Sequence, residues 1–517
     1  MTTVQPIRLR TRIAEFSLSA ILAVTMAVFL FFAVVGLVST CTVDIGFTAT
    51  NNEHVSFLAD NVFRNLLFLL VFFCIARIVL LLPAGGEKHR PLLLKGALVL
   101  AVTGMGCWWV LSTHTLPCAD AQTILEEAAR LARGNYESLI ATSYFRIFPF
   151  QLGYLLYAEG FFRVFSENAI VAIQLVNVLW VDVAFLALLA ITRELFHDDR
   201  LELLTGVLLL FCLQPVFLCT FPYGVLPGLG LSLGGVYFVV AYMRDHAIWR
   251  LIPAALLLAL AIALRKNCTI LLIACCIGLA LHVLKTKQLS GLMGIAVMAV
   301  LAWLIPFGVQ KSYEVRTDAV FGQGTPQGAW LVTGFEESSM CCGWFGSYTT
   351  TVFSDNGFDR EKTEKQIAQD FSERMAVFAD RPRYLASFLY KKVVSQWNEP
   401  AYQSIWSSAV SPHEGKPAPL AESLLFGEAG ESMKQYFNDY VQFVYLCFAL
   451  GLAFLVKKER RMTDAVVILP LTVFGAFLYH ALFEAKAQYA LVYLPMMLPF
   501  AAYGAKRILS LLPVRKG

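Results

Sequence analysis

The sequence predicts an all-α polytopic membrane protein, and three observations lead to that fold class. The 517-residue chain is 58% hydrophobic and only 15% charged, whereas a soluble globular protein carries about 25% charged residues. Apolar runs of about 20 residues, each long enough to cross a hydrocarbon core, recur along the chain. Because lipid offers no hydrogen-bond partners to the backbone, such runs are expected to cross as helices.

Hydropathy predicts about twelve membrane-spanning helices. The first run follows Arg8, Arg10 and Arg12 and could be mistaken for a signal peptide. Its apolar stretch is longer than a signal-peptide core, and no small-x-small cleavage site follows it. The expected spans are residues 16–38, 62–83, 94–112, 168–192, 201–219, 224–243, 248–264, 268–284, 289–307, 441–456, 464–482 and 487–508.

Lysine and arginine residues are distributed unequally between the loops that join these spans. When the N-terminus is placed inside, most basic loop residues and the basic C-terminal tail fall on the same side. Cytoplasmic loops carry such an excess of positive charge. We therefore expect both termini in the cytoplasm and a multi-pass location in a cell membrane, taken here as the plasma membrane of a bacterium.

The segment from Phe148 to Phe165 decides this topology. It is apolar enough to be counted as a span, and counting it would place the later basic loops outside. It is short, however, and contains Glu159 and Arg163. We interpret it as an amphipathic helix lying at the outer interface. The loop formed by residues 113–167 is then outside.

Residues 308–440 are more polar and are expected to form a small extracytoplasmic α-rich domain. A helix is predicted from about Arg360 to Phe378 with Asp359 as its cap, followed by a break at Pro382 and a second helix towards Trp397. The tryptophans and tyrosines gathered here could stack on sugar rings or form the core of the domain. The expected organisation is a two-helix extension (1–93), a transmembrane module (94–307), this outer domain (308–440) and C-terminal helices (441–517).

The twelve cysteines do not indicate a metal site or a disulfide framework. They are scattered, several lie inside apolar runs, and none forms a C-x-x-C pair with zinc spacing. Adjacent cysteines form a disulfide only with strain, so Cys341 and Cys342 are expected to be free thiols. No cofactor and no nucleic-acid partner are expected.

Two cations, Arg265 and Lys266, lie at the outer face and depart from the positive-inside pattern. Cations there are unfavourable unless an anionic group meets them. A lipid-linked phosphate would do so, since arginine offers a forked set of donors and lysine a point charge. The alternative is that both side chains extend towards lipid headgroups.

A second polar group, formed by His480, Glu484, Lys486 and Tyr489, lies at an outer turn between the last two spans. Glu484 and Lys486 could form an interfacial ion pair that contributes little to stability. Alternatively, Lys486 binds a phosphate and Glu484 orients it.

Asp120 lies in the first long polar interruption, ahead of a helix-like run of alanine, leucine, glutamate and arginine. It could cap that helix by accepting its free amide groups. It could instead act as general base for an incoming hydroxyl. Arg146, which precedes Phe148-Pro149, would add a cation at the same outer surface.

Two weaker patterns are expected to be structural. The glycine-rich face around Gly230 and Gly235 indicates close helix packing. Asp182, inside a span, is expected to make a buried hydrogen bond between helices.

In several stretches the chain resembles polyprenyl-phosphate-sugar-dependent glycosyltransferases of the GT-C fold, which include protein mannosyltransferases and aminoarabinose transferases. The family pattern is an aspartate soon after a membrane helix, then an Ala/Leu helix ending in Gly-aromatic, then a proline-led aromatic helix. The matching residues frame about residues 95–308 and 440–510: Asp120, Gly134-Asn135-Tyr136, Pro149-Phe150-Gln151, Leu264-Arg265-Lys266-Asn267, and Glu484, Lys486 and Tyr489.

The resemblance implies transfer of a sugar from a polyprenyl-phosphate donor to a glycan, lipid or protein acceptor at the outer face. Asp120 would be the base that activates the acceptor. Arg146, Arg265, Lys266 and Lys486 would bind the donor phosphate, with Glu484 and Tyr489 in support. Some members carry a second acidic residue at the next outer turn, and residues 220–227 contain none.

Two other function classes compete with this reading. A transporter or lipid flippase should show repeated halves or broken helices around a midplane site, and the charges here gather at one face instead. A structural protein that binds a partner through its outer domain would leave the cations of that face without a role.

Overall fold

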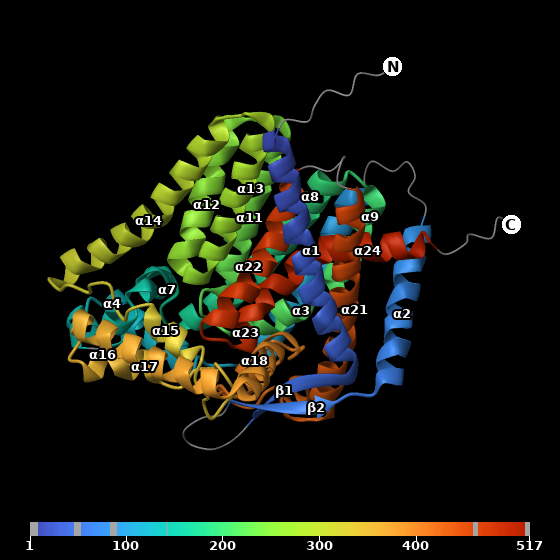
Figure 1. The fold of residues 1–517 in the computed structure, drawn as a ribbon. Helices are drawn as coiled ribbons and strands as arrows, with labels where there is room; N and C mark the ends of the chain where they lie inside the picture. Colours follow the sequence, from blue (N-terminus) through green and yellow to red (C-terminus); the bar gives the residue numbers. More distant parts are fainter. Residues whose placement is uncertain (1–8, 46–52, 83–89, 142, 459–463, 512–517) are drawn as a thin grey trace.

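Long apolar helices make up most of the computed structural model, which describes residues 9–45, 53–82, 90–141, 143–458 and 464–511 (Figure 1). Within these residues, nine helical segments are long and apolar enough to cross a membrane, and a bent pair would add a tenth. Large apolar side chains on the bundle surface, such as Leu70 and Trp303, are 59% and 64% exposed. A lipid surround removes the cost of that exposure. The chain is a multi-pass helical membrane protein.

The longer apolar helices are α1 (Leu9–Val38), α2 (Val62–Leu81), α3 (Arg90–Thr113), α8 (Ala169–Phe196), α9 (Asp199–Phe211), α11 (Val225–Asp245), α12 (Leu251–Leu264), α13 (Thr269–Thr286), α14 (Ser290–Thr317), α21 (Glu428–Lys458), α22 (Ile468–Leu482) and α24 (Leu494–Leu509). The shorter or more polar helices are α4 (Ala119–Ala132), α5 (Glu137–Ala141), α6 (Tyr144–Ile147), α7 (Leu152–Phe165), α10 (Gln214–Phe217), α15 (Gly328–Thr333), α16 (Tyr348–Asp355), α17 (Arg360–Asp380), α18 (Pro382–Trp397), α19 (Trp406–Ala409), α20 (Pro419–Phe426) and α23 (Ala487–Ala490).

The expected number of about twelve spans is not confirmed, because three of the expected spans are short or broken. Residues 248–264 form an apolar helix below the length of a full span. The expected 201–219 span bends by 41° between α9 and α10, where Pro215 lies in the first turn of the second helix. The expected last span is divided between α23 and α24, and Pro495 lies in the first turn of α24. Proline removes a helical hydrogen bond, so such breaks are expected at these positions.

The segment expected to lie at the interface forms α7, a helix of 14 residues and about 21 Å. It follows α4 and α6 and leads into α8 through a short turn. Its Glu159 is buried and binds Arg163 of the same helix at 2.7 Å and Arg316 of α14 at 2.9 Å. The charged face of α7 is therefore directed at α14. Its position relative to the membrane surface stays a prediction.

A β-hairpin occurs within the N-terminal extension, where only helices were expected. β1 (Ser39–Ile45) pairs antiparallel with β2 (Glu53–Ala59), from Ser39↔Ala59 to Ile45↔Glu53. The hairpin is hydrogen-bonded to the 308–440 segment through Val55 N and Met340 O at 3.1 Å and Cys41 N and Asn398 O at 2.9 Å. Figure 1 shows it at the same end of the bundle as α15–α18, which we call the hairpin end.

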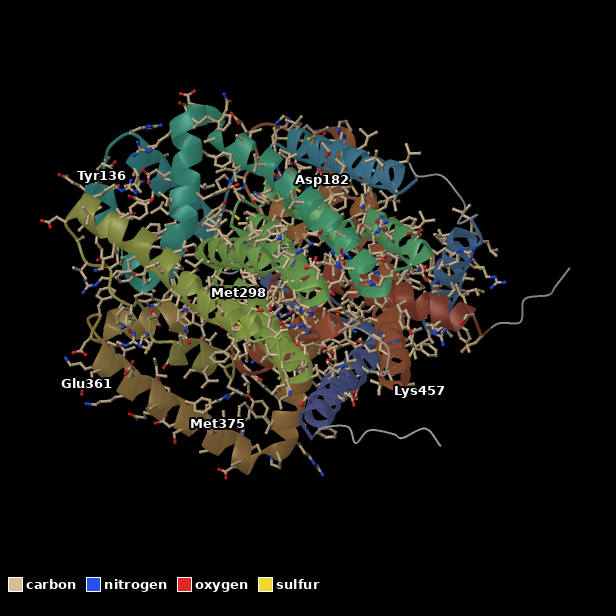
Figure 2. The ribbon with its side chains drawn as sticks, turned by 90° about the horizontal axis from the view of Figure 1, so that it is seen from above. Tyr136, Asp182, Met298, Glu361, Met375 and Lys457 are labelled. Carbon is tan, nitrogen blue, oxygen red and sulfur yellow. The ribbon has the colours of Figure 1, made fainter. Side chains whose placement is uncertain are left out.

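The helices predicted in the 308–440 segment are confirmed. α17 starts after Asp359, whose carboxylate accepts Lys362 N at 3.1 Å, and α18 starts at Pro382 and ends at Trp397. Figure 2, viewed along the bundle, places Glu361 and Met375 of α17 at the rim of the molecule, and Met298 of α14 nearer its centre. α14 and α21 both extend into this segment, so no sharp boundary separates it from the bundle.

Both structural expectations for the bundle interior are confirmed. A Cβ at Gly230 would lie 2.7 Å from the Trp180 ring, and one at Gly235 would lie 2.7 Å from Leu258. The hydroxyl of Thr103 in α3 donates to Asp182 of α8 at 2.6 Å. The cysteines of the described residues, including Cys341 and Cys342, are free thiols, as expected.

Candidate functional site

Asp120 lies in the first turn of α4 and does not cap it. The helix begins at Ala119, and the capping position belongs to Cys118. The Asp120 side chain instead accepts a hydrogen bond from the Tyr223 hydroxyl at 2.9 Å. The capping interpretation is therefore wrong, and an exposed carboxylate is held at the hairpin end by another element.

Tyr223, which precedes α11, joins Asp120 to Arg265. Its hydroxyl also accepts a hydrogen bond from the side-chain amide of Gln151, and its ring lies 4.7 Å from the Arg265 guanidinium. The next residue, Gly224, has φ +71°, and a Cβ there would lie 2.6 Å from the carbonyl oxygen of Leu264. Only glycine allows this approach, which brings Tyr223 beside the end of α12.

Arg265 begins the turn after α12, in an extended conformation with φ −150° and ψ 107°. Its guanidinium faces two rings, that of Tyr223 and that of Tyr489 at 5.8 Å. Among the described residues, no ion pair or hydrogen bond links this guanidinium to an acidic side chain. Tyr489 in turn donates its hydroxyl to Glu484 at 2.8 Å. Arg265 is thus a positioned cation with free hydrogen-bond donors.

An apolar groove starts at Arg265 and runs between α11, α13 and the last helical segments. It has an empty volume of about 430 Å³, including the space open to solvent. Its walls include Leu229, Leu271, Val492 and Met496 beside Arg265. Arg265 is the one charged residue among the described residues of this lining, so an anionic group that reaches the groove would meet a cation beside apolar side chains.

The turn that carries Glu484 is held by the 308–440 segment. Glu484 N donates to Trp330 O at 3.0 Å, and Ala485 N donates to Gly343 O at 2.8 Å. Lys392 of α18, a buried side chain, donates to the carbonyl oxygens of Gly334 at 2.5 Å and Ala481 at 3.0 Å. Burial lowers the pKa of Lys392 to about 7. These contacts fix the turn against the hairpin end.

Lys486 pairs with Glu53 of β2 at 2.5 Å rather than with Glu484. The expected interfacial pair between Glu484 and Lys486 is therefore not formed. Burial raises the pKa of Glu484, the Tyr489 hydroxyl and Lys486 lower it, and the negative charges of Asp120 and Glu53 raise it. Glu484, Lys486 and Tyr489 lie on one turn, and Tyr489 faces Arg265 at 5.8 Å, so the Glu53–Lys486 pair joins the turn that contacts Arg265.

The remaining two predicted cations, Lys266 and Arg146, contact other aromatic rings. The Lys266 ammonium, on an exposed side chain, is 5.3 Å from the Phe150 ring. The rings of Phe148 and Phe150 each lie 6.1 Å from the ring of Trp330, and the three residues form an aromatic cluster. Arg146 lies 4.2 Å from the ring of Phe358, just ahead of α17. The structure thus connects Arg265, Tyr489 and Glu484 with Asp120 and gives Arg146 a different neighbour.

The carboxylate of Asp120 affects the ionisation of its neighbour. Burial raises the pKa of Tyr223, Asp120 raises it further, and Arg265 opposes them. Tyr223 therefore stays protonated at neutral pH and donates to the carboxylate. Among the described residues, Tyr223 is the one side chain that donates to Asp120, and it binds one of the two carboxylate oxygens. A general base needs an oxygen that can accept the proton of the acceptor.

Three residues of this site were missed in the sequence. Tyr223 and Gln151 occur in aromatic, proline-containing turns, where a hydroxyl or amide gives no pattern of its own. Glu53 lies in a strand whose partner, Lys486, is 433 residues away. The sequence feature that could have pointed to Tyr223 is its position directly before a glycine, Gly224, in a proline-containing turn.

A metal site is not evident at this end of the bundle. In the ranges that the structure describes, no group of three or more histidine, cysteine, aspartate or glutamate side chains could hold a metal ion. Neither protein-family models nor curated proteins give a match to this chain.

Proposed function

We propose that the protein is a membrane-embedded glycosyltransferase that moves a sugar from a polyprenyl-phosphate donor to an acceptor hydroxyl. The observation that carries the proposal is the arrangement of Asp120, Tyr223 and Arg265 at the end of an apolar groove. A lipid-linked sugar phosphate has an apolar chain, an anionic link and a reactive anomeric carbon. In the proposal, the groove takes the apolar chain, the Arg265 guanidinium binds the anionic link, and the Asp120 carboxylate serves the reaction at the anomeric carbon.

In the proposed reaction, the acceptor oxygen attacks the anomeric carbon of the sugar. Asp120 takes the proton of that hydroxyl as the new carbon–oxygen bond forms. The bond between the anomeric carbon and the phosphate oxygen breaks, and its electron pair stays on the phosphate. Arg265 stabilises the charge that develops there, because a guanidinium can donate two charge-assisted hydrogen bonds to a phosphate.

Tyr223 acts in this scheme as a positioning residue. It holds Asp120 through its hydroxyl and Arg265 through its ring, so base and cation keep a fixed separation. Lys266 would add positive charge near the aromatic cluster of Phe148, Phe150 and Trp330, whose rings are suited to a sugar face. An extracytoplasmic position of the hairpin end belongs to the same proposal and rests on the distribution of basic residues.

The test uses the protein in lipid nanodiscs and a panel of polyprenyl-phosphate sugars. In each donor the sugar carries the label. We expect the wild type to release polyprenyl phosphate and to form a labelled product. Asp120→Asn should reduce turnover by about 100-fold or more, the range of general-base catalysis. Tyr223→Phe should retain part of the activity. Glu126→Gln, on the same helix, serves as the control.

Two results would contradict the proposal. The first is a wild type that cleaves no member of the panel but moves intact lipid across the bilayer, which would indicate a flippase. The second is an Asp120→Asn variant with wild-type turnover and expression, which would remove Asp120 as the base.

A further inference from the structure

Glu53 brings a carboxylate of the N-terminal hairpin to the candidate site. It is the first residue of β2, and its side chain is only 11% exposed. One oxygen binds the Lys486 ammonium at 2.5 Å. The other, Oε2, is buried and has no hydrogen-bond partner among the described residues. Lys486 is thus the group that compensates most of the charge of Glu53.

The pair lies at the turn that carries Tyr489, whose ring is 5.8 Å from the Arg265 guanidinium. Cys118, two residues before Asp120, has its pKa raised by burial, and the charges of Lys486, Glu53 and Asp120 all act on it. The same three charges act on Glu484. Any anion that binds between Arg265 and Lys486 therefore meets the negative charge of Glu53 as well. At short range in a partly buried site, such a repulsion weakens the binding of the anion.

The proposed reaction changes the charge of the phosphate. In the donor, the phosphate joins lipid and sugar and carries one negative charge. When the bond to the anomeric carbon breaks, the phosphate keeps the electron pair and becomes a monoester with up to two negative charges. A site that only attracts anions would hold this product more tightly than the donor and slow the next turnover.

We propose that Glu53 is a counter-ion that competes with the lipid phosphate for Lys486 and thereby promotes release of the lipid phosphate product. Lys486 leaves Glu53 while charge develops on the leaving group, and Glu53 takes Lys486 back as the product departs. No proton or electron is transferred in this exchange. The inference rests on the proposed function, because it assigns Lys486 to the phosphate of that reaction.

The experiment compares wild type, Glu53→Gln and Asp44→Asn in nanodiscs. Asp44 lies on β1 and its carboxylate accepts a hydrogen bond from Ser56, so it is a matched carboxylate on the same hairpin. Farnesyl phosphate is the probe, and inorganic phosphate shows whether the anion alone suffices. Turnover is measured with the polyprenyl-phosphate sugar that the panel identifies.

We expect Glu53→Gln to bind farnesyl phosphate about tenfold more tightly, which corresponds to the loss of one nearby charge. Its KM for the donor and its kcat should both fall, and farnesyl phosphate should become a stronger product inhibitor. Asp44→Asn should match the wild type in each measurement. Glu53→Asp keeps the charge on a shorter side chain, so we expect smaller changes in affinity, KM and kcat in the same direction. This variant remains informative if Glu53→Gln misfolds.

Two negative outcomes are distinguishable. If the wild type binds farnesyl phosphate but Glu53→Gln binds it equally or more weakly, the counter-ion role is wrong and the proposed function stands. If the wild type binds neither phosphate, the proposed function and this inference both fail. Equal effects of Asp44→Asn and Glu53→Gln would assign the change to the hairpin fold and overturn the role of Glu53.

Discussion

Arg265 owes its orientation to aromatic rings rather than to an acidic partner. The rings of Tyr223 and Tyr489 lie 4.7 and 5.8 Å from its guanidinium. Cation–π contacts of this kind hold an arginine without using its hydrogen-bond donors. A phosphate can therefore bind Arg265 without first displacing a carboxylate, in contrast to Lys486.

This difference leads to a prediction for Arg265→Ala. The variant should raise KM for a polyprenyl-phosphate donor at least about tenfold and also lower kcat, because a charge-assisted contact is lost in both the bound and the transition state. Arg265→Lys should recover only part of the loss, since it cannot form a two-point contact. Steady-state kinetics with a labelled donor measures both constants.

The control is Arg250→Ala. Arg250 precedes α12 at the other end of the same helix and pairs with Asp245 at 2.6 Å. It should behave as wild type. Unchanged donor dependence in Arg265→Ala would remove Arg265 from the phosphate site.

The sequence identified individual candidate site residues better than it identified the residues that contact them. Arg265 and Lys486 stood out because cations at the expected outer face depart from the usual pattern. Their neighbours could not be predicted, since Tyr223 approaches through a glycine turn and Glu53 through strand pairing. Asp120 was assigned two possible roles, and the hydroxyl of Tyr223 decided against the capping role.

Among the elements, the loop between α18 and α19 depends on one buried carboxylate. Glu399 is 4% exposed. Its two oxygens accept the backbone amides of Ala401 at 3.2 Å and Gln403 at 2.7 Å. The loop residues Tyr402 and Gln403 have positive φ angles of 48° and 55°. Burial raises the pKa of Glu399 to about 7, although the amides and Lys434 oppose the shift.

The raised pKa predicts a dependence of stability on pH. Between about 4.5 and about 7, the folded state binds the proton of Glu399 and the unfolded state does not, so stability falls as pH rises through this window. Above it, both states are ionised and the contribution is constant. The melting temperature of the wild type should fall from pH 5 to pH 7 relative to that of Glu399→Gln, as measured by thermal unfolding in detergent.

A matched control for this series is Glu422→Gln. Glu422 has a side chain that is 42% exposed and pairs with Lys416 at 3.2 Å. It should keep the wild-type profile. A wild type whose stability rises over the same window relative to Glu399→Gln would contradict the prediction.

The elements show where hydropathy is informative and where it fails. α17 and α18 were predicted closely because an aspartate cap and a proline mark their starts. The spans around Pro215 and Pro495 were expected to be continuous, since apolar composition does not report where a proline starts a new helix. The hairpin was missed because its strands of seven residues are short and each follows or precedes a strong helical run.

The shorter and more polar elements of the molecule gather at one end. The hairpin, α4 and α15–α18 lie together below the bundle in Figure 1, and α1 begins at its other end. The sequence predicted that the loop after α3 and the 308–440 segment share a side, and the structure brings them into contact: Thr325 N donates to Ile147 O at 3.0 Å. Which side of the membrane this end faces stays a prediction.

Topology can be tested by cysteine labelling. A single cysteine placed at Glu361, on an exposed part of α17, should react with a membrane-impermeant maleimide in intact cells. A cysteine at Lys287, after α13, should react only after the membrane is permeabilised. The experiment uses a background in which the exposed Cys74 and the partly exposed Cys107, Cys118, Cys276 and Cys341 are replaced by serine, so that the other native cysteines are buried. The reverse labelling pattern would place the hairpin end in the cytoplasm.

The pairing of Glu53 with Lys486 also sets an order for biogenesis. A ribosome adds about 5–20 residues per second, so the 433 residues between them take roughly 20 to 90 seconds to make. During that time the hairpin has left the ribosome while the lysine that neutralises it does not yet exist. The candidate site can therefore be completed only after Lys486 has been made, and a nascent chain that stops before α22 has no means of assembling it.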